Sequence, residues 1–120
     1  DLATRRQSAA CDSSTMSDRS RNISVAVRLK PGVLGASTDW SADNSDSTCL
    51  HDARTGEAWH FDRVLAPGTS TQQLFETCGK DVVEAFCTGV NGTILTYGQT
   101  ASGKTYTMQG DGNVKGVIQL

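Results

Sequence analysis

The sequence lacks any apolar run near the length needed to span a bilayer, and its N-terminus lacks the apolar segment of a signal peptide. It also lacks an excess of charge of either sign, because 11 Lys and Arg residues stand against 13 Asp and Glu residues. A net charge of −2 offers no electrostatic footprint for nucleic acid or for an anionic membrane. We therefore expect a cytoplasmic chain with no nucleic acid and no membrane among its partners.

Closely spaced cysteine pairs of the kind that mark metal or redox sites are lacking. The four cysteines are Cys11, Cys49, Cys78 and Cys87. His51 and His60 do not complete a metal-ligand spacing with them and are interpreted as ordinary strand or surface residues. We expect four reduced thiols in a cytosolic protein. The alternative is a secreted, disulfide-bonded domain glycosylated at the sequons of Asn22 and Asn91, which the lack of a secretory signal disfavours.

The length and composition set the size of the expected domain. The 120 residues are enough for one small domain, and 37% hydrophobic with 20% charged residues suits a soluble chain with a modest core. Residues 1–21 are rich in Ser, Arg, Asp and Thr and lack apolar periodicity, which predicts a disordered tail. The chain begins with Asp1 and reaches Leu120 without a terminating feature, so we expect a fragment of a longer protein.

Residues 98–105 fit the phosphate-binding pattern G-x-x-x-x-G-K-[ST]. Gly98 and Gly103 allow turns that a Cβ would obstruct, and such turns point successive N–H groups into a concave anion site. Lys104 would bring a positive charge to the β- and γ-phosphates, and the Thr105 hydroxyl would bind Mg²⁺. The alternative is a glycine-rich surface turn with an incidental lysine. The candidate phosphate-binding residues are Gly98, Gln99, Thr100, Ala101, Ser102, Gly103, Lys104 and Thr105.

The pattern requires a strand before the loop and a helix after it. Residues 93–97 form a short, β-branched, apolar run, which predicts a strand that ends at Gly98. Residues 104–109 can open a helix, whose N-terminal dipole and free N–H groups would add to the anion site. Residues 109–113 then predict a flexible turn, and residues 114–120 are too few to classify.

Residues 22–30 predict a strand, because apolar and polar residues alternate from Ile23 onward with a period of two. Arg28 and Lys30 leave the same face of this strand at its C-terminal end. Ligands bind outside such ends in open α/β sheets, although a solvated strand edge is the simpler interpretation of the two cations alone. Pro31 then ends the ladder.

A small antiparallel lobe is predicted after this strand. Residues 54–57 carry a hairpin-turn signal between strands expected at 49–53 and 58–65. Trp40 and Trp59 are expected to form the core of the lobe rather than a ligand platform.

A helix is predicted over residues 71–88. Ser70 and Gln73 form a capping box at its start, and Gly89 suits the position after its end. Apolar residues recur at helical spacing, so one stripe should face a core. Because a sheet must cover this stripe, the helix should cross over into a parallel strand at 93–97. The stripe consists of Leu74, Phe75, Cys78, Val82, Ala85 and Phe86.

Several of these segments resemble the motor domain of kinesins. Residues 28–31 (RLKP) resemble the R-x-R-P that ends its first strand, and residues 61–64 (FDRV) resemble its F-D-x-V-F strand. Residues 91–108 are similar almost throughout to the kinesin signature N-G-T-I-F-A-Y-G-Q-T-x-x-G-K-T-x-T-M. Residues 116–118 resemble the start of G-I-I-P-R. The resemblance covers about residues 22–118, and its Ala-Ser-Gly-Lys-Thr-Tyr variant is similar to the centromere-associated branch.

The resemblance implies an ATP site and gives each matching residue a role. Residues 99–105 would hold the phosphates, with Lys104 and Thr105 as catalytic residues and Thr105 as the Mg²⁺ ligand. Lys30 stands where the family has a second arginine, and a compact ammonium cannot stack on a base as a guanidinium does. Residues 119–120 replace the Pro-Arg of the last motif. The residues implied in adenine binding are Arg28, Lys30, Pro31 and Tyr106.

The implied fold class is α/β of the P-loop NTPase type, with a mostly parallel sheet, the antiparallel lobe beside it, and only the N-terminal part present. Residues 22–120 would be the nucleotide-binding half of a motor domain. The family's N-x-x-S-S-R-S-H and D-x-x-G-S-E switch segments lie downstream of the matched region, as do its tubulin-binding elements. The chain alone would therefore not hydrolyse ATP at a motor rate. It would also be unstable alone, because strands and the helix lack neighbours.

The intact protein would bind ATP and Mg²⁺ and move along microtubules. It would act in the cytoplasm and on the cytoskeleton, and the resemblance is compatible with an intact protein that is a dimer. Three alternatives remain open. One is a different P-loop NTPase that acts as a nucleotide-dependent switch. Another is a truncated or pseudo-motor that only binds microtubules or other partners. The third, a soluble α/β domain with an accidental loop, would bind no nucleotide.

Overall fold

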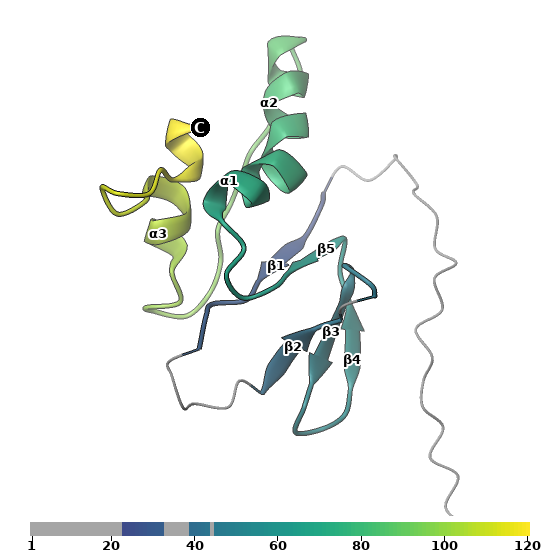
Figure 1. Ribbon diagram of the computed structural model, residues 1–120. Coiled ribbons are helices and arrows are strands. Elements are labelled where there is room, and N and C mark those ends of the chain that lie inside the picture. The colour runs from purple at the N-terminus through teal and green to yellow at the C-terminus, as the bar shows by residue number, and fades with distance from the viewer. Residues whose placement is uncertain (1–22, 33–38, 44) are drawn as a thin grey trace, which may run out of the picture.

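The computed structural model describes residues 23–32, 39–43 and 45–120. The predicted disordered tail at 1–21 lies outside these residues. Two small sheets and two helical regions make up the described chain (Figure 1). In Figure 1 the two-stranded sheet lies between the helices and a three-stranded lobe. The predicted α/β class, with parallel pairing and an antiparallel lobe, is confirmed.

The parallel sheet pairs β1 (Ala26–Arg28) with β5 (Arg63–Leu65). The pairing extends one residue past β1, since the Leu29 N–H donates to the Leu65 carbonyl at 3.0 Å. Val64 and Leu65 are buried, so β5 supplies part of the core. The strand predicted at 22–30 is therefore present, but its regular part is shorter than its alternating pattern.

The lobe has the strand order β2 (Trp40–Ala42), β3 (Cys49–Asp52) and β4 (Ala58–His60), all antiparallel. The predicted hairpin between β3 and β4 is confirmed. Gly56 turns the chain with a φ of +74°, and its N–H donates to the Asp52 carbonyl at 2.8 Å. The buried Asp52 carboxylate accepts the Arg54 N–H at 2.8 Å, which holds the turn closed.

The single strand predicted over residues 58–65 is wrong, because β4 and β5 belong to different sheets. The chain leaves the lobe after the Phe61 N–H bonds the Thr48 carbonyl at 2.9 Å. It then meets the other sheet at Asp62, whose carboxylate accepts the Val25 N–H at 2.8 Å. Residues 58–65 contain no glycine or proline that would mark this change of partner, so the composition could not reveal the break.

The prediction that Trp40 and Trp59 form the core of the lobe is also wrong. The two residues are 37% and 47% exposed, and their rings meet edge to face with centroids 6.3 Å apart. Cross-strand pairing puts Trp59 opposite the buried Leu50, so both lie on one face. The tryptophans thus form an outer layer over this face, while Cys49 and Leu50 are buried.

The predicted helix at 71–88 is one helical segment with a wider turn inside it. It consists of α1 (Thr71–Leu74), the π-helical η1 (Phe75–Gly79) and α2 (Lys80–Cys87). The capping box is confirmed: the Gln73 N–H donates to Ser70 Oγ at 3.1 Å, and the Ser70 N–H donates to Gln73 Oε1 at 3.0 Å. Gly89 follows the helix with a φ of +92°, as predicted.

The predicted strand at residues 93–97 does not form, because no strand within the described residues lies beside it. Leu95 is 86% exposed and Tyr97 is fully exposed. A β-branched, apolar composition suits an extended backbone, but only a neighbouring strand can supply the ladder hydrogen bonds. The family resemblance places further strands downstream of the matched region.

The chain ends in α3 (Lys104–Gln109), a turn and the short 3₁₀ helix η2 (Val117–Gln119), which lie side by side (Figure 1). The helix predicted at 104–109 is confirmed. The turn closes by a bridge between Gly110 and Lys115, and the Asp111 carboxylate accepts the Val114 N–H at 3.0 Å. In the described part of the chain, no helix has the length and apolar character needed to cross a membrane.

Candidate nucleotide-binding site

The loop from Gly98 to Gly103 curls tightly before α3. Gly103 has a φ of +100° and passes the chain directly into Lys104, the first residue of α3. Gly98 has a φ of +156°, and a Cβ there would come within 2.6 Å of Ser102 Oγ, so the loop favours glycine at this position. Ala101 also adopts a left-handed conformation with a φ of 63°, which is uncommon outside glycine.

The Lys104 side chain folds back across the loop that precedes it. Its ammonium group donates to the carbonyl oxygens of Gly98 and Gln99, both at 2.8 Å. These two bonds fix a positive charge over the first turn of the loop, six and five residues back along the chain. Thr105 follows in the first turn of α3 and is exposed. A cation and an exposed hydroxyl residue therefore follow each other at the start of α3, directly after the loop.

Lys30 connects the end of the first strand to the loop. Its ammonium group donates to the Ala101 carbonyl at 3.1 Å, across 71 residues of sequence. Pro31 follows and is exposed. The structure thus brings the C-terminal end of β1 against the loop, as the strand-end argument anticipated.

The Arg28 side chain of β1 forms hydrogen bonds to α3, to α1 and to the segment just before α1. Its guanidinium donates to Thr107 Oγ1 of α3 at 2.9 Å, to Thr71 Oγ1 of α1 at 3.3 Å and to the Thr69 carbonyl at 3.0 Å. It also lies 5.6 Å from the centroid of the Tyr106 ring, within the range of a cation–π contact. The solvated strand edge considered for Arg28 is therefore wrong, since its charged group is surrounded by fixed acceptors.

Sequence reasoning missed the acceptors of Arg28. Thr71 is buried and begins α1, while Thr107 lies one turn into α3. Threonine is common at helix starts, so neither residue carried a signal by itself. Only the approach of β1 to both helices reveals that they share one arginine.

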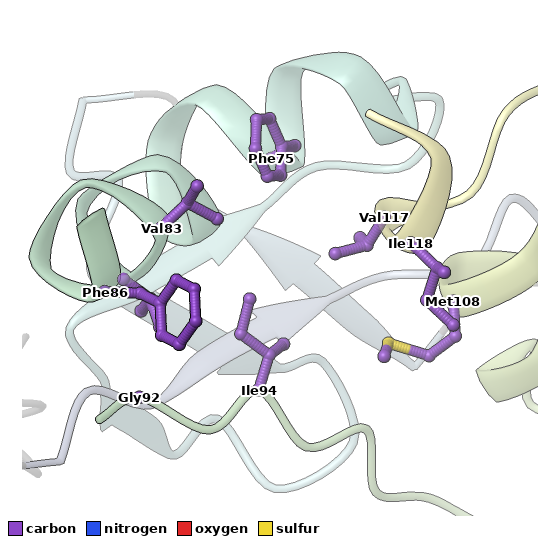
Figure 2. A pocket seen from close by; sticks show the side chains of 9 residues that line it. Phe75, Val83, Phe86, Gly92, Ile94, Met108, Val117 and Ile118 are labelled. Carbon is purple, nitrogen blue, oxygen red and sulfur yellow. The ribbon is translucent and has the colours of Figure 1, made fainter. Parts of the chain in front are cut away.

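An apolar hollow of about 340 Å³ lies apart from the residues of this site. Figure 2 shows its lining, which comes from the helix after Ser70, from the segment around Ile94 and from the C-terminal part of the chain. The lining is apolar, so it offers no group that could hold a phosphate. The hollow marks the part of the helical stripe that the described residues leave uncovered, as the exposure of Phe86 shows.

The cysteines occupy three different environments. Cys49 is buried in β3, while Cys87 at the end of α2 is exposed. Burial raises the pKa of the Cys78 thiol, against the opposing effect of the positive charge of Arg63. Cys11 lies outside the described residues. Sequence reasoning gave His51 no metal-binding partners, yet its imidazole lies against Asp43 and Cys49.

Comparison with known proteins agrees with this arrangement of strand end, loop and helix. The model of the kinesin motor domain family matches residues 4–120, which begins within the segment predicted as a tail. The chain is 39% identical over 104 residues to kinesin-like protein KIN-7D, chloroplastic, of Oryza sativa subsp. japonica, covering 82% of this chain and 10% of that protein. It is 37% identical over 111 residues to kinesin-like protein KIN-7D, mitochondrial, of Arabidopsis thaliana, covering 88% and 10%.

The chain thus spans about a tenth of the length of these curated relatives. The match to the family model covers nearly all of it, and the matched region contains the loop, β1 and both helical regions described above. The chain belongs to the kinesin motor domain family, and it is a fragment of such a motor domain.

Proposed function

We propose that this chain is the nucleotide-binding part of a motor that hydrolyses ATP to move along microtubules. The observation that carries the proposal is the bond from Lys30 to the Ala101 carbonyl at 3.1 Å. It joins a strand end suited to a base with a loop suited to phosphates, and both parts are needed to hold a nucleoside triphosphate.

The phosphates would bind at the loop. Lys104 already has its charge at the loop mouth, where it would exchange its two carbonyl acceptors for oxygens of the β- and γ-phosphates. The loop N–H groups of residues 99–105 would contribute further donors. Charge and donors positioned before the reaction stabilise the negative charge of phosphoryl transfer, which is the catalytic role proposed for Lys104.

Thr105 fits a role as a magnesium ligand. Its hydroxyl is a hard oxygen on an exposed residue beside Lys104, and Mg²⁺ prefers such ligands together with phosphate oxygens and water. The bound ion would neutralise charge on the phosphates during transfer. Thr105 would thereby orient the ion and the phosphates with respect to Lys104.

The base would lie between the end of β1 and α3. Tyr106 has one ring face near the Arg28 guanidinium, and the residue remains partly exposed for stacking on adenine. Lys30 and Pro31 would border the same space. Arg28 would act largely by holding Tyr106, since its donors are already bonded to Thr71, Thr107 and Thr69.

Hydrolysis and movement are proposed for the intact protein. Phosphoryl transfer needs groups that position the attacking water, and the family resemblance puts these downstream of the matched region. The 120-residue chain by itself should therefore bind nucleotide without hydrolysing it at a motor rate.

The test is microtubule-stimulated ATPase activity of the intact protein with Lys104→Ala, using Lys115→Ala as the matched control on an exposed turn. We expect wild type and the control to be stimulated, and Lys104→Ala to lose at least about a hundredfold in rate. An unstimulated wild type would favour a pseudo-motor that only binds its track. A normal rate in Lys104→Ala would contradict the site itself.

A further inference from the structure

Three metal-ligating side chains meet in the antiparallel lobe, away from the nucleotide site. Cys49 and His51 are two residues apart on β3 and therefore share one face of the strand. Asp43 comes directly after β2, and its N–H donates to the Cys49 carbonyl at 3.1 Å. Backbone pairing of two strands thus brings the carboxylate beside the thiol and the imidazole.

Two distances within this cluster are close to those of a tetrahedral metal site. His51 Nε2 lies 3.1 Å from Asp43 Oδ2 and 3.5 Å from Cys49 Sγ, and all three ligand atoms lie within 4.8 Å of one another. Around a tetrahedral zinc ion, bonds of about 2.0–2.3 Å separate such ligand atoms by roughly 3.3–3.6 Å. An ion could therefore be bound with shifts of a few tenths of an ångström in the two distances from His51, together with an approach of Asp43 Oδ2 and Cys49 Sγ from within 4.8 Å.

The same ring nitrogen of His51 lies within contact distance of both Asp43 and Cys49. If Nε2 carries a hydrogen, it can donate well to Asp43 or to Cys49, but not fully to both. A cation at the shared centre would instead accept an electron pair from each of the three atoms. The simpler interpretation, a His51–Asp43 pair with Cys49 as a packing residue, predicts no special affinity for metal.

The carboxylate is held in position by its other oxygen. Asp43 Oδ1 accepts the Ser45 N–H at 2.7 Å, the Ser45 hydroxyl at 2.6 Å and the Asp46 N–H at 3.3 Å. Oδ2 is left to face His51. Outer hydrogen bonds of this kind orient ligands in metal sites and strengthen binding.

The ligands Cys49 and His51 differ in their exposure to solvent. Cys49 is fully buried, whereas the His51 side chain is 39% exposed, so an ion could enter from the His51 side and keep a water as its fourth ligand. Thiolate and imidazole ligands select zinc-like cations over magnesium. The Thr105 hydroxyl at the nucleotide site would favour magnesium instead, because it is a hard oxygen ligand.

We propose that Asp43, Cys49 and His51 form a binding site for a divalent cation of the zinc class. Binding would displace the thiol proton of Cys49 to solvent and form bonds from Sγ, Nε2 and Oδ2 to the ion. The ion would fasten the end of β2 to β3 and stiffen the lobe. The proposal does not depend on nucleotide binding.

The test uses Co²⁺ as the probe, added to the intact, metal-stripped protein. We expect one tightly bound equivalent with the absorption of a cobalt–thiolate bond and of tetrahedral cobalt, and displacement by Zn²⁺ but not by excess Mg²⁺. Cys49→Ser should remove the thiolate band, and His51→Ala should weaken binding at least about tenfold.

The control variant Cys87→Ser replaces a thiol of the same chemistry at the exposed end of α2, outside the cluster, and should leave the cobalt spectrum unchanged. If burial makes Cys49→Ser unfold, the half-exposed His51→Ala decides the matter alone. The proposal is overturned if wild type shows no thiolate band, or if the band and the affinity persist in His51→Ala.

Discussion

Replacing Arg28 by lysine tests the junction on which the nucleotide site rests. The guanidinium makes three hydrogen bonds, to Thr71, Thr107 and the Thr69 carbonyl, and it lies 5.6 Å from the Tyr106 ring centroid. Lysine keeps the charge but offers a single ammonium group in place of a planar fork. Because the ammonium group is a single centre on a different stem, we expect the bond to Thr107 Oγ1 to survive in Arg28→Lys and the bonds to Thr71 Oγ1 and the Thr69 carbonyl to be lost.

The magnitude follows from the bonds that are lost. Two partly buried hydrogen bonds at about 1 kcal/mol each give a loss of about 2 kcal/mol in the free energy of unfolding. That is roughly a thirtyfold change in the ratio of folded to unfolded protein. At a slope of about 2 kcal/mol per molar, the urea midpoint should fall by about 1 M.

The assay is urea unfolding of the intact protein followed by tryptophan fluorescence, with nucleotide titration alongside. Arg63→Lys is the matched control, because Arg63 is exposed and donates only to the adjacent Asp62 carbonyl among the bonds described, at 3.0 Å. Arg28→Lys should shift the midpoint and weaken ATP binding, whereas the control should change neither. Equal, small shifts in both variants would refute the structural role given to Arg28.

Two further predictions concern local structure. Ser70→Ala should lower the free energy of unfolding by about 1 kcal/mol in the same urea assay, because it removes the acceptor of the Gln73 N–H. The conservative Ser70→Thr should retain most of the free energy of unfolding. A Ser70→Ala variant as stable as wild type would contradict the capping box. The Arg54 N–H donates to the Asp52 carboxylate and is the main cause that holds the pKa of this group below its ordinary value. The stability that the carboxylate contributes is therefore fully present above about pH 4 and is lost as pH falls through its folded pKa. Thermal midpoints of wild type should therefore approach those of Asp52→Asn below about pH 4, and a gap that stays constant with pH would rule this out.

Local sequence signals predicted local structure well. The capping box of Ser70, the turn at Gly56 and the helix at 104–109 all form where the sequence predicts them. Each depends on backbone groups within a few residues, so the sequence contains both partners of the interaction. No local signal of this kind predicted the π-helical turn at Phe75–Gly79. The turn does bring Gly79 close to the Phe75 ring, where a Cβ on Gly79 would lie only 2.8 Å away.

Features that need a distant partner were predicted poorly. The pattern over 58–65 could not tell one strand from two, because the change of sheet depends on which backbone Asp62 meets. The run at 93–97 has the composition of a strand but has no neighbour among the described residues. Trp40 and Trp59 are large and apolar, yet their position on the outer face of the lobe depends on the register of three strands.

The sequence by itself determined the phosphate-binding loop pattern and, through residues 91–108, the kinesin family, because those positions are contiguous and each has a fixed chemical role. Only the tertiary structure decided what surrounds the loop. Arg28 finds its acceptors in two helices, and Lys30 reaches Ala101 across 71 residues. The physical reason is that short-range hydrogen bonds between distant segments depend on how sheets and helices pack, which local residue spacing does not encode.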